Sequence, residues 1–274
     1  MQHQEYFFEY KEHELFGQYW IPDDCKAMIL LVHGMGEYSS RYEDYVIPKL
    51  LKEHIAVITY DNFGHGKSIG KRGHCPSYDA LMKVLDIVCQ KASEIAGDLP
   101  VFLYGHSMGG NLVINYILRN APKITGAILT SPFLRLAFQP PAWKMTIGKL
   151  FQKIAPSVTL PSGLDVKAIS RIKEEVDKYK NDPLVHDKVS ANFSLPIIKA
   201  GDWAITKASQ LETPVLLVHG TEDQITDFNA SKEFAKKTNY IDFISFDGGY
   251  HELHNDLEKE KLILTITAWI QEKY

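Results

Sequence analysis

The 274-residue chain has 45% hydrophobic, 23% charged and 11% aromatic residues, which is typical of an ordinary globular protein and excludes a disordered or fibrous chain. Its formal net charge of −4, without any block of lysines and arginines, excludes a general attraction to phosphate backbones, so we expect no nucleic-acid partner. A chain of this length can build one large core, and we expect a single α/β core with an insertion.

The N-terminal residues indicate the compartment, and the cysteines indicate whether disulfides or metal sites are expected. The sequence from Met1 to Glu5 contains neither a basic nor an apolar segment, and no run of about 18 apolar residues occurs in the chain, so we expect a cytoplasmic protein. Cys25, Cys75 and Cys89 are widely spaced, without a CxxC pair or a neighbouring histidine cluster. We therefore expect no disulfide framework, no metal and no cofactor.

The elements predicted in chain order form a mostly parallel α/β sheet. Roughly alternating polar and apolar residues at 5–10 and 14–20, around a polar break, predict an antiparallel hairpin. Unbroken apolar runs, typical of parallel strands covered on both faces, follow at 27–32, 56–60, 101–104, 127–129 and 215–218. Helix-length segments at 78–95, 110–119, 229–237 and 257–273 alternate with these strands, and a last strand is expected at 241–246.

The stretch 134–199 interrupts the alternation of strands and helices. It is rich in proline and contains helical pieces but no strand-like run. We interpret it as an inserted, mainly helical cap, which leaves residues 1–133 and 200–274 as the core.

One helix of this cap is expected to be amphipathic and basic. Apolar side chains recur at helical spacing and lysines lie between them; these are Trp143, Ile147, Leu150, Phe151 and Ile154, with Lys144, Lys149 and Lys153. Two interpretations fit this pattern. The helix either packs on the core, or it is a lid that makes transient contact with an anionic lipid surface.

A GxSxG pattern marks the candidate nucleophile. Gly105, Ser107 and Gly109 directly follow a predicted strand and directly precede a predicted helix. At average composition the pattern arises by chance in roughly one chain in ten of this length. Its position between a predicted strand and a predicted helix is therefore more informative than the pattern itself. The two glycines remove the Cβ clashes of so tight a turn, and the turn exposes the serine hydroxyl. Ser107 is therefore the predicted nucleophile.

A serine nucleophile needs hydrogen-bond donors for the oxyanion that develops on its substrate. Ser107 precedes a helix N-terminus, whose free N–H groups favour negative charge, so the Met108 amide is the first predicted donor. The glycine-flanked turn from His33 to Gly36 can direct a second amide at the same oxygen, and we assign it to Met35. The alternative for that turn, considered without Ser107, is an ordinary strand end.

A serine hydroxyl also needs a histidine that takes its proton and a carboxylate that orients the histidine. Where a serine turn of this kind lies in a parallel sheet, the chain order is serine, acid, histidine. The loop after the run at 215–218 offers Asp223, with Glu222 and Asp227 as alternatives. The loop after the last strand offers His251, with His254 as its rival.

Residues 61–68 form a further glycine-rich turn with the sequence DNFGHGKS. The segment lacks the GxxxxGK[ST] spacing of a phosphate-binding loop. We predict a structural turn beside the site and assign it no catalytic group.

Three segments together resemble the monoacylglycerol lipases, and the similarity extends over nearly the whole chain. They are HGMGEYSSRY at 33–42, GHSMGG at 105–110 and GYHELH at 249–254, and the cap adds SR at 170–171 and NDPLV at 181–185. The resemblance implies an α/β-hydrolase fold, with a mostly parallel eight-stranded central sheet, helices on both faces and a cap. It implies a cofactor-independent serine esterase that hydrolyses monoacylglycerol through an acyl-enzyme. Its relatives also act on lysophospholipids.

The resemblance further implies a polar pocket for a glycerol head group. The glutamate, arginine and second histidine that line this pocket in the family match Glu37, Arg41 and His254. A surface ion pair between Glu37 and Arg41 is the alternative. The chain also departs from the family: Asn62 stands where relatives often have histidine, and no cysteine follows Cys89, so thiol-reactive inhibition is not expected.

Other functional classes compete with this interpretation. Dehalogenases and epoxide hydrolases use an aspartate as nucleophile, and Ser107 argues against both. A lysophospholipase, a broad carboxylesterase, a proline-releasing peptidase and a non-catalytic ligand-binding homologue all keep this fold. The sequence does not determine the oligomeric state, the acyl-chain length or the preferred head group.

Overall fold

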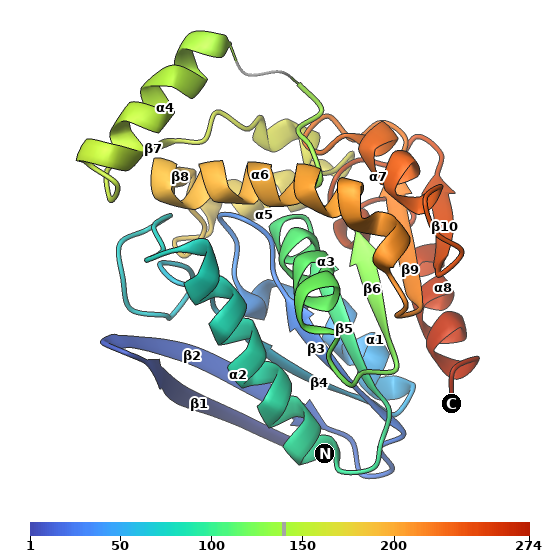
Figure 1. Cartoon of the computed structure of the whole chain (residues 1–274). Helices are drawn as coiled ribbons and strands as arrows, with labels where there is room; N and C mark the ends of the chain where they lie inside the picture. Colours follow the sequence, from blue (N-terminus) through green and yellow to red (C-terminus); the bar gives the residue numbers. More distant parts are fainter. Residues whose placement is uncertain (139–140) are drawn as a thin grey trace.

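The fold begins with the hairpin that the sequence predicts. The computed structural model describes residues 1–138 and 141–274, apart from the side chains of residues 142, 144 and 145. β1 (Gln2–Tyr10) pairs antiparallel with β2 (His13–Ile21), and β2 pairs antiparallel with β4 (Ile55–Tyr60). The hairpin therefore forms one edge of the central sheet (Figure 1).

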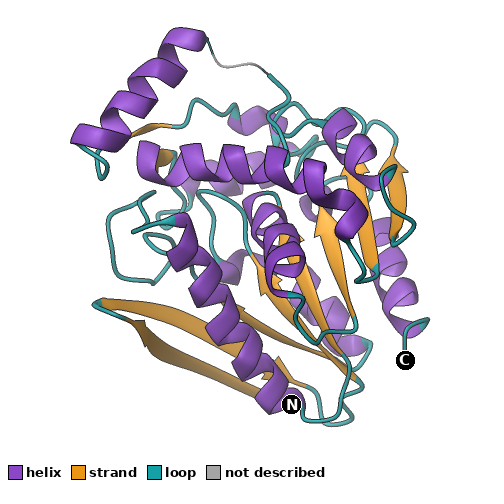
Figure 2. Cartoon of the chain, in the orientation of Figure 1, coloured by secondary structure: helices purple, strands orange, loops and turns teal. Residues whose placement is uncertain are grey.

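Six parallel strands complete an eight-stranded sheet with the order β1-β2-β4-β3-β5-β6-β9-β10. The strands not yet described are β3 (Ala27–Val32), β5 (Val101–His106), β6 (Gly126–Thr130), β9 (Val215–Gly220) and β10 (Ile241–Phe246). All except β10 are buried along their whole length, as is β4, which explains their unbroken apolar sequences. The predicted mostly parallel sheet is confirmed, and its six parallel strands end on one side, beneath the cap (Figure 2).

Helices cover both faces of this sheet, as the sequence predicts. One face carries α1 (Val46–Lys52) and α8 (Lys259–Gln271). The other carries α2 (Tyr78–Ala96), α3 (Met108–Asn120), α6 (Ala191–Lys207) and α7 (Phe228–Ala235). Short 3-10 turns lie at Ser39–Tyr42, Val166–Ala168, Ala208–Gln210 and Leu253–Asn255. Among the described helices, none is both long and apolar enough to cross a membrane.

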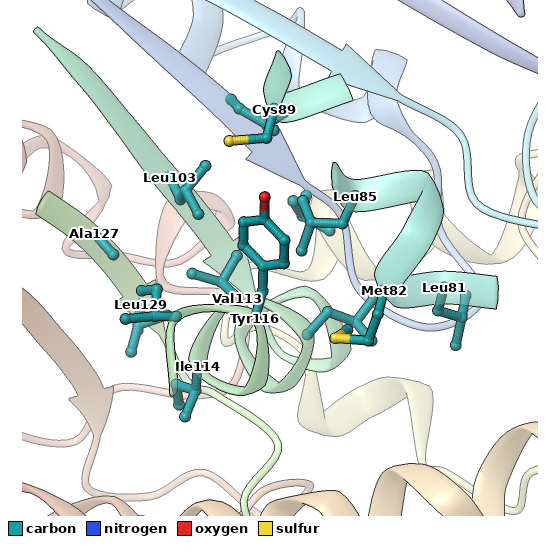
Figure 3. Close-up of a cluster of buried hydrophobic side chains, with 14 of the residues drawn as sticks. Leu81, Met82, Leu85, Cys89, Leu103, Val113, Ile114, Tyr116, Ala127 and Leu129 are labelled. Atoms are coloured by element: carbon teal, nitrogen blue, oxygen red, sulfur yellow. The ribbon is translucent and has the colours of Figure 1, made fainter. Parts of the chain in front are cut away.

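The core between α2, α3 and the sheet fixes the position of α3. Figure 3 shows Tyr116 of α3 among apolar side chains from Leu85 and Cys89 of α2 and Leu103 of β5. The Tyr116 hydroxyl donates a hydrogen bond of 2.7 Å to Asp86 Oδ1 at the edge of this layer. Because α3 begins at Met108, two residues earlier than predicted, this packing also holds the turn that carries Ser107.

The cap contains two strands that the sequence does not reveal. Its helices are α4 (Ala142–Ile154) and α5 (Lys173–Asn181), and between them and α6 lie β7 (Thr159–Pro161) and β8 (Lys188–Ser190). β7 and β8 pair antiparallel as a separate two-stranded sheet. The sequence shows no strand-like run at either place, because segments of three residues are too short to show a pattern.

The proposed cap boundary at residue 199 falls inside a continuous helix. α6 runs through Pro196 and past the boundary to Lys207. Asn111 Nδ2 of α3 donates to the Ile197 carbonyl at 3.0 Å, and Asn115 Nδ2 donates to the Ala200 carbonyl at 3.2 Å. These hydrogen bonds join the helix to the core on both sides of the boundary, so α6 belongs to the cap and the core at once.

Candidate active site

Ser107 lies at a strained turn between β5 and α3. Its φ of 52° is in the left-handed region that non-glycine residues rarely adopt. A Cβ at Gly105 would lie 2.5 Å from the Gly109 carbonyl oxygen, and a Cβ at Gly109 would lie 2.0 Å from the Val32 carbonyl oxygen. Both glycines of the GxSxG pattern are therefore required by close backbone contacts, as their spacing predicts.

Asp223 is the carboxylate that the structure brings to His251. His251 Nδ1 lies 2.7 Å from Asp223 Oδ2, while Oδ1 accepts hydrogen bonds from the amides of Ile225 and Thr226 at 2.8 and 2.9 Å. Burial opposes ionisation of this carboxyl group, but the neighbouring His251 and His219 hold its pKa well below the usual range. Asp223 is thus a buried, oriented anion.

The two alternative carboxylates do not contact His251. Glu222 is exposed to solvent. Asp227 precedes α7 and accepts a hydrogen bond of 2.8 Å from the Asn229 amide, which is the role of a helix-capping residue. Asp223 is favoured over both by geometry as well as by chain order.

The His251 ring lies in the same small cavity as Ser107. This cavity has a volume of about 40 Å³, and both side chains contribute to its wall. Burial lowers the pKa of His251, but the negative charge of Asp223 outweighs it, and the pKa is raised overall. Because Asp223 contacts Nδ1, Nε2 is the nitrogen available to Ser107. In the described part of the chain, the Ser107 hydroxyl forms no hydrogen bond with His251, as is common before a substrate is bound.

His254, the rival base, is buried behind His251. Its ring stacks on Tyr42 with centroids 4.9 Å apart and meets His106 edge-on at 4.8 Å. Burial lowers the pKa of His254, and neither ring nitrogen has a hydrogen-bond partner among the described residues. This placement separates His254 from Asp223 and favours His251 as the base.

The turn that contains Met35 lies against the nucleophile. A Cβ at Gly34 would be 3.3 Å from the Ser107 Cβ. The Gly34 amide donates to Glu37 Oε1 at 2.6 Å, and Gly36 has a φ of 79°, so the turn is held in one conformation. Met35 on this turn and Met108 at the start of α3 stay our proposed oxyanion donors.

A second, larger cavity meets the small one at Ser107. It has a volume of about 300 Å³, and Met35 and Ser107 line both cavities. Its wall is mostly apolar and is built by the core and the cap together, with side chains that include Phe133, Leu160, Leu195, Ile197 and Ile225. The small cavity has carboxylates in its wall. Ser107 therefore lies between a large apolar cavity and a small one whose wall combines apolar side chains with carboxylates.

Only one of the three expected head-group residues lines the small cavity. Glu37 lines the small cavity, whereas Arg41 and His254 do not. The predicted direct contact of Arg41 and His254 with a ligand is therefore not supported. Arg41 is occupied by two carboxylates, and His254 lies beneath Tyr42. The surface ion pair is also wrong, because the Glu37 and Arg41 side chains are only 2% and 9% exposed.

Glu252 is a site residue that the sequence did not reveal. It lines the small cavity and forms a two-pronged ion pair with Arg41, at 2.8 Å for Nη1 to Oε1 and 2.9 Å for Nη2 to Oε2. The two residues are 211 positions apart, so no local spacing could predict the contact. The only available signal was that Glu252 directly follows His251.

The turn at 61–68 forms hydrogen bonds with the segment that contains the oxyanion turn. The Asn62 amide donates to His33 Nε2 at 2.9 Å, and Asp61 accepts from the amides of Ser39 and Lys67 at 2.8 Å each. These contacts agree with the predicted structural role. Among the described residues, no group of three or more potential metal ligands is placed to hold an ion.

Comparisons with known proteins identify the relatives of this chain. A family model described as serine aminopeptidase S33 matches residues 23–258. A monoglyceride lipase homolog of Monkeypox virus is 31% identical over 262 residues, which cover 93% of this chain and 94% of that protein. An uncharacterized abhydrolase domain-containing protein of Dictyostelium discoideum is 36% identical over 251 residues, or 90% of this chain, which spans only 26% of that protein. The crystal structure of Paleococcus ferrophilus monoacylglycerol lipase matches with a TM-score of 0.87 and 33% identity, over 95% of this chain and 99% of that one.

We predict that titration of the His251 ring distinguishes Asp223 from its alternatives. In the wild type, NMR of the His251 ring should give a pKa above the ordinary value of about 6.5. Asp223→Asn removes the charge that stabilises the imidazolium, so the pKa of His251 should fall. Asp227→Asn is the matched control and should leave it unchanged. A fall in the Asp227 variant instead would contradict the assignment.

Proposed function

We propose that this protein cleaves monoacylglycerols to a fatty acid and glycerol. The chain belongs to the α/β-hydrolase family described as serine aminopeptidase S33, and it is a carboxylic ester hydrolase like the monoglyceride lipases. The observation that carries this proposal is the meeting of two unlike cavities at Ser107. The large apolar cavity suits one acyl chain, and the small cavity, which has carboxylates among the apolar side chains of its wall, suits a compact polyol.

The first half of the proposed reaction acylates Ser107. Its Oγ attacks the ester carbonyl carbon while His251 Nε2 takes the hydroxyl proton, and Asp223 stabilises the imidazolium that results. The Met35 and Met108 amides donate to the oxyanion of the tetrahedral intermediate. The bond to the glycerol oxygen then breaks, His251 returns its proton to that oxygen, and the acyl group stays on Ser107.

The second half releases the fatty acid. A water molecule takes the place of glycerol, and His251 removes its proton as the water attacks the acyl carbon. The second tetrahedral intermediate collapses, the bond to Ser107 Oγ breaks, and His251 reprotonates that oxygen. Each proton removed by His251 is returned, so the reaction requires no cofactor.

The small cavity offers hydrogen-bond acceptors and a donor for a polyol. Glu37 Oε2 and Glu252 Oε1 each accept one hydrogen bond from Arg41, which leaves lone pairs free for hydroxyl groups. Tyr179 of α5 also lines this cavity. A triacylglycerol carries two further acyl chains on the glycerol, and a cavity of about 40 Å³ cannot admit them.

Substitution of the three proposed catalytic residues tests the reaction. We expect Ser107→Ala, His251→Ala and Asp223→Asn each to lower ester turnover by about 10⁴-fold or more, with losses that do not add when combined. Turnover of a monoacylglycerol and covalent labelling by a fluorophosphonate are the measurements, with Asp227→Asn as the control. Near wild-type turnover by Asp223→Asn would overturn the acid assignment. Turnover and labelling that persist in Ser107→Ala would overturn the nucleophile assignment.

A substrate panel tests the proposed head group. The wild type should favour a monoacylglycerol over the matching methyl ester, lysophosphatidylcholine and triacylglycerol, because it alone combines one acyl chain with a small head whose hydroxyls can donate to Glu37 and Glu252, at about 1–3 kcal/mol for each hydrogen bond lost. Tyr179→Phe should raise KM for the monoacylglycerol severalfold and leave the methyl ester unchanged. Equal kcat/KM for all esters would indicate a broad carboxylesterase, and preference for an aminoacyl anilide would indicate a peptidase.

We further propose that α4 contacts lipid surfaces transiently. Its apolar side chains Trp143, Ile147, Leu150 and Ile154 are 40–69% exposed, and the exposed Lys149 and Lys153 lie on the same helix. A helix packed on the core through its apolar stripe would bury these side chains. Figure 1 shows α4 outermost in the cap, above α6, where it can approach a membrane that holds the substrate.

Vesicle co-sedimentation tests this contact. Binding to anionic vesicles should fall severalfold when Leu150→Ser and Ile154→Ser are combined, because the variant loses apolar area that would enter the bilayer. Leu264→Ser is the matched control, since Leu264 is 67% exposed on α8, away from the cap. Equal sedimentation of both variants and the wild type would remove the proposal.

A further inference from the structure

Arg41 joins two loops that carry opposite halves of the proposed catalytic machinery. One prong contacts Glu37 Oε2 at 2.7 Å, close to the turn that holds Met35. Both prongs contact Glu252, which directly follows His251. One guanidinium group therefore spans the distance between the oxyanion turn and the loop of the base.

Glu37 transmits this contact to the turn itself. Its Oε1 accepts a hydrogen bond of 2.6 Å from the Gly34 amide and another of 2.8 Å from the Tyr42 hydroxyl. Glu37 thus holds the peptide that precedes the one bearing the Met35 N–H, and His33 Nδ1 lies 2.7 Å from the Gly34 carbonyl oxygen of that next peptide. A displacement of Glu37 would release the turn next to Ser107.

Glu252 is equally fixed at the other end. Its Oε2 accepts from Asn255 Nδ2 at 2.8 Å, and its backbone amide donates to the Ile169 carbonyl of the cap at 2.8 Å. The Tyr179 ring covers the guanidinium with its centroid 4.6 Å from Cζ. The side chains of Glu252 and Arg41 are only 4% and 9% exposed, so water competes little for this ion pair.

We propose that Arg41, bridged between Glu37 and Glu252, is a positioning residue that holds the oxyanion turn and the His251 loop in register around Ser107. Its guanidinium acts through the two carboxylates and does not contact the substrate. This inference deepens the proposed function and rests on it for the roles of Met35 and His251. It differs in assigning Arg41 to the geometry of every ester reaction instead of to recognition of the head group.

The same network changes the electrostatics of the base. The charged or titratable groups that face His251 from the core are Asp223, His106, Glu37, Glu252 and His254, and the cap adds Asp165 and Tyr179 to the wall of the same cavity. Asp223 raises the pKa of His251 most among the charges, and Glu252 and Glu37 add to it. Removing the charge of Glu252 destabilises the imidazolium and lowers that pKa. Because the base acts when neutral, the acidic limb of the reaction should then move to lower pH.

The test uses an alkyl fluorophosphonate, a reagent that labels activated serines and has no polyol head. The rate of covalent labelling is measured against pH in the wild type, Glu252→Gln and Arg41→Lys, and thermal unfolding confirms that each variant is folded. Arg41→Lys keeps the positive charge but not the planar fork that reaches both carboxylates. Glu258→Gln is the matched control, because Glu258 pairs with Arg171 and not with Arg41.

We expect labelling of Glu252→Gln and Arg41→Lys to be at least about tenfold slower than in the wild type at the plateau of the pH profile. The acidic limb should move to lower pH in Glu252→Gln and stay in place in Arg41→Lys, where the net charge is kept. The Glu258→Gln profile should match the wild type. Wild-type labelling rates in both folded site variants would overturn the proposal and return Arg41 to a structural or head-group role.

This readout is separate from the proposed substrate. If the wild type is labelled but does not prefer a monoacylglycerol, the proposed function fails while the positioning network is still tested by the labelling rates. If the wild type is not labelled at all, Ser107 is not an activated nucleophile, and the proposed function and the positioning network both fail.

Discussion

The close approach of α3 to β3 is the constraint on which the site depends. Gly109 lies so near the Val32 carbonyl that a Cβ there would be 2.0 Å from its oxygen. This contact places the N-terminus of α3 beside the end of β3, and Ser107 accepts a φ of 52° in consequence. The turn with Met35 begins where β3 ends. The contact between Gly109 and Val32 therefore also brings the nucleophile Ser107 next to the oxyanion turn.

The buried charged side chains near Ser107 form two connected groups. Asp223 is held by backbone amides and faces His251, and Arg41 lies between Glu37 and Glu252. Each carboxylate in these sets has hydrogen-bond donors, which offsets the cost of its burial. One guanidinium serves two carboxylates, so the surroundings of His251 stay negative and favour its charged form.

The cap is joined to the site by backbone hydrogen bonds as well as by the cavity wall. The His251 and Glu252 amides donate to the Ala168 and Ile169 carbonyls, and the His186 amide donates to the Gly36 carbonyl. The cap thus contacts both the base loop and the oxyanion turn. Residues of the cap also line both cavities beside Ser107, the large apolar one and the small one with carboxylates in its wall, and the proposed substrate with one acyl chain and a small head follows from this division.

The sequence by itself determined the sheet, the serine turn and the order of Ser107, Asp223 and His251, because strand burial, glycine spacing and chain order are local or ordered signals. Only the tertiary structure decided that Glu252 pairs with Arg41, that α6 crosses the expected cap boundary and that two short strands lie in the cap. These features depend on contacts between distant segments, or on elements too short to have a period. The role of a residue such as Glu252 depends on the partner that folding brings to it, and no local sequence pattern predicts that partner.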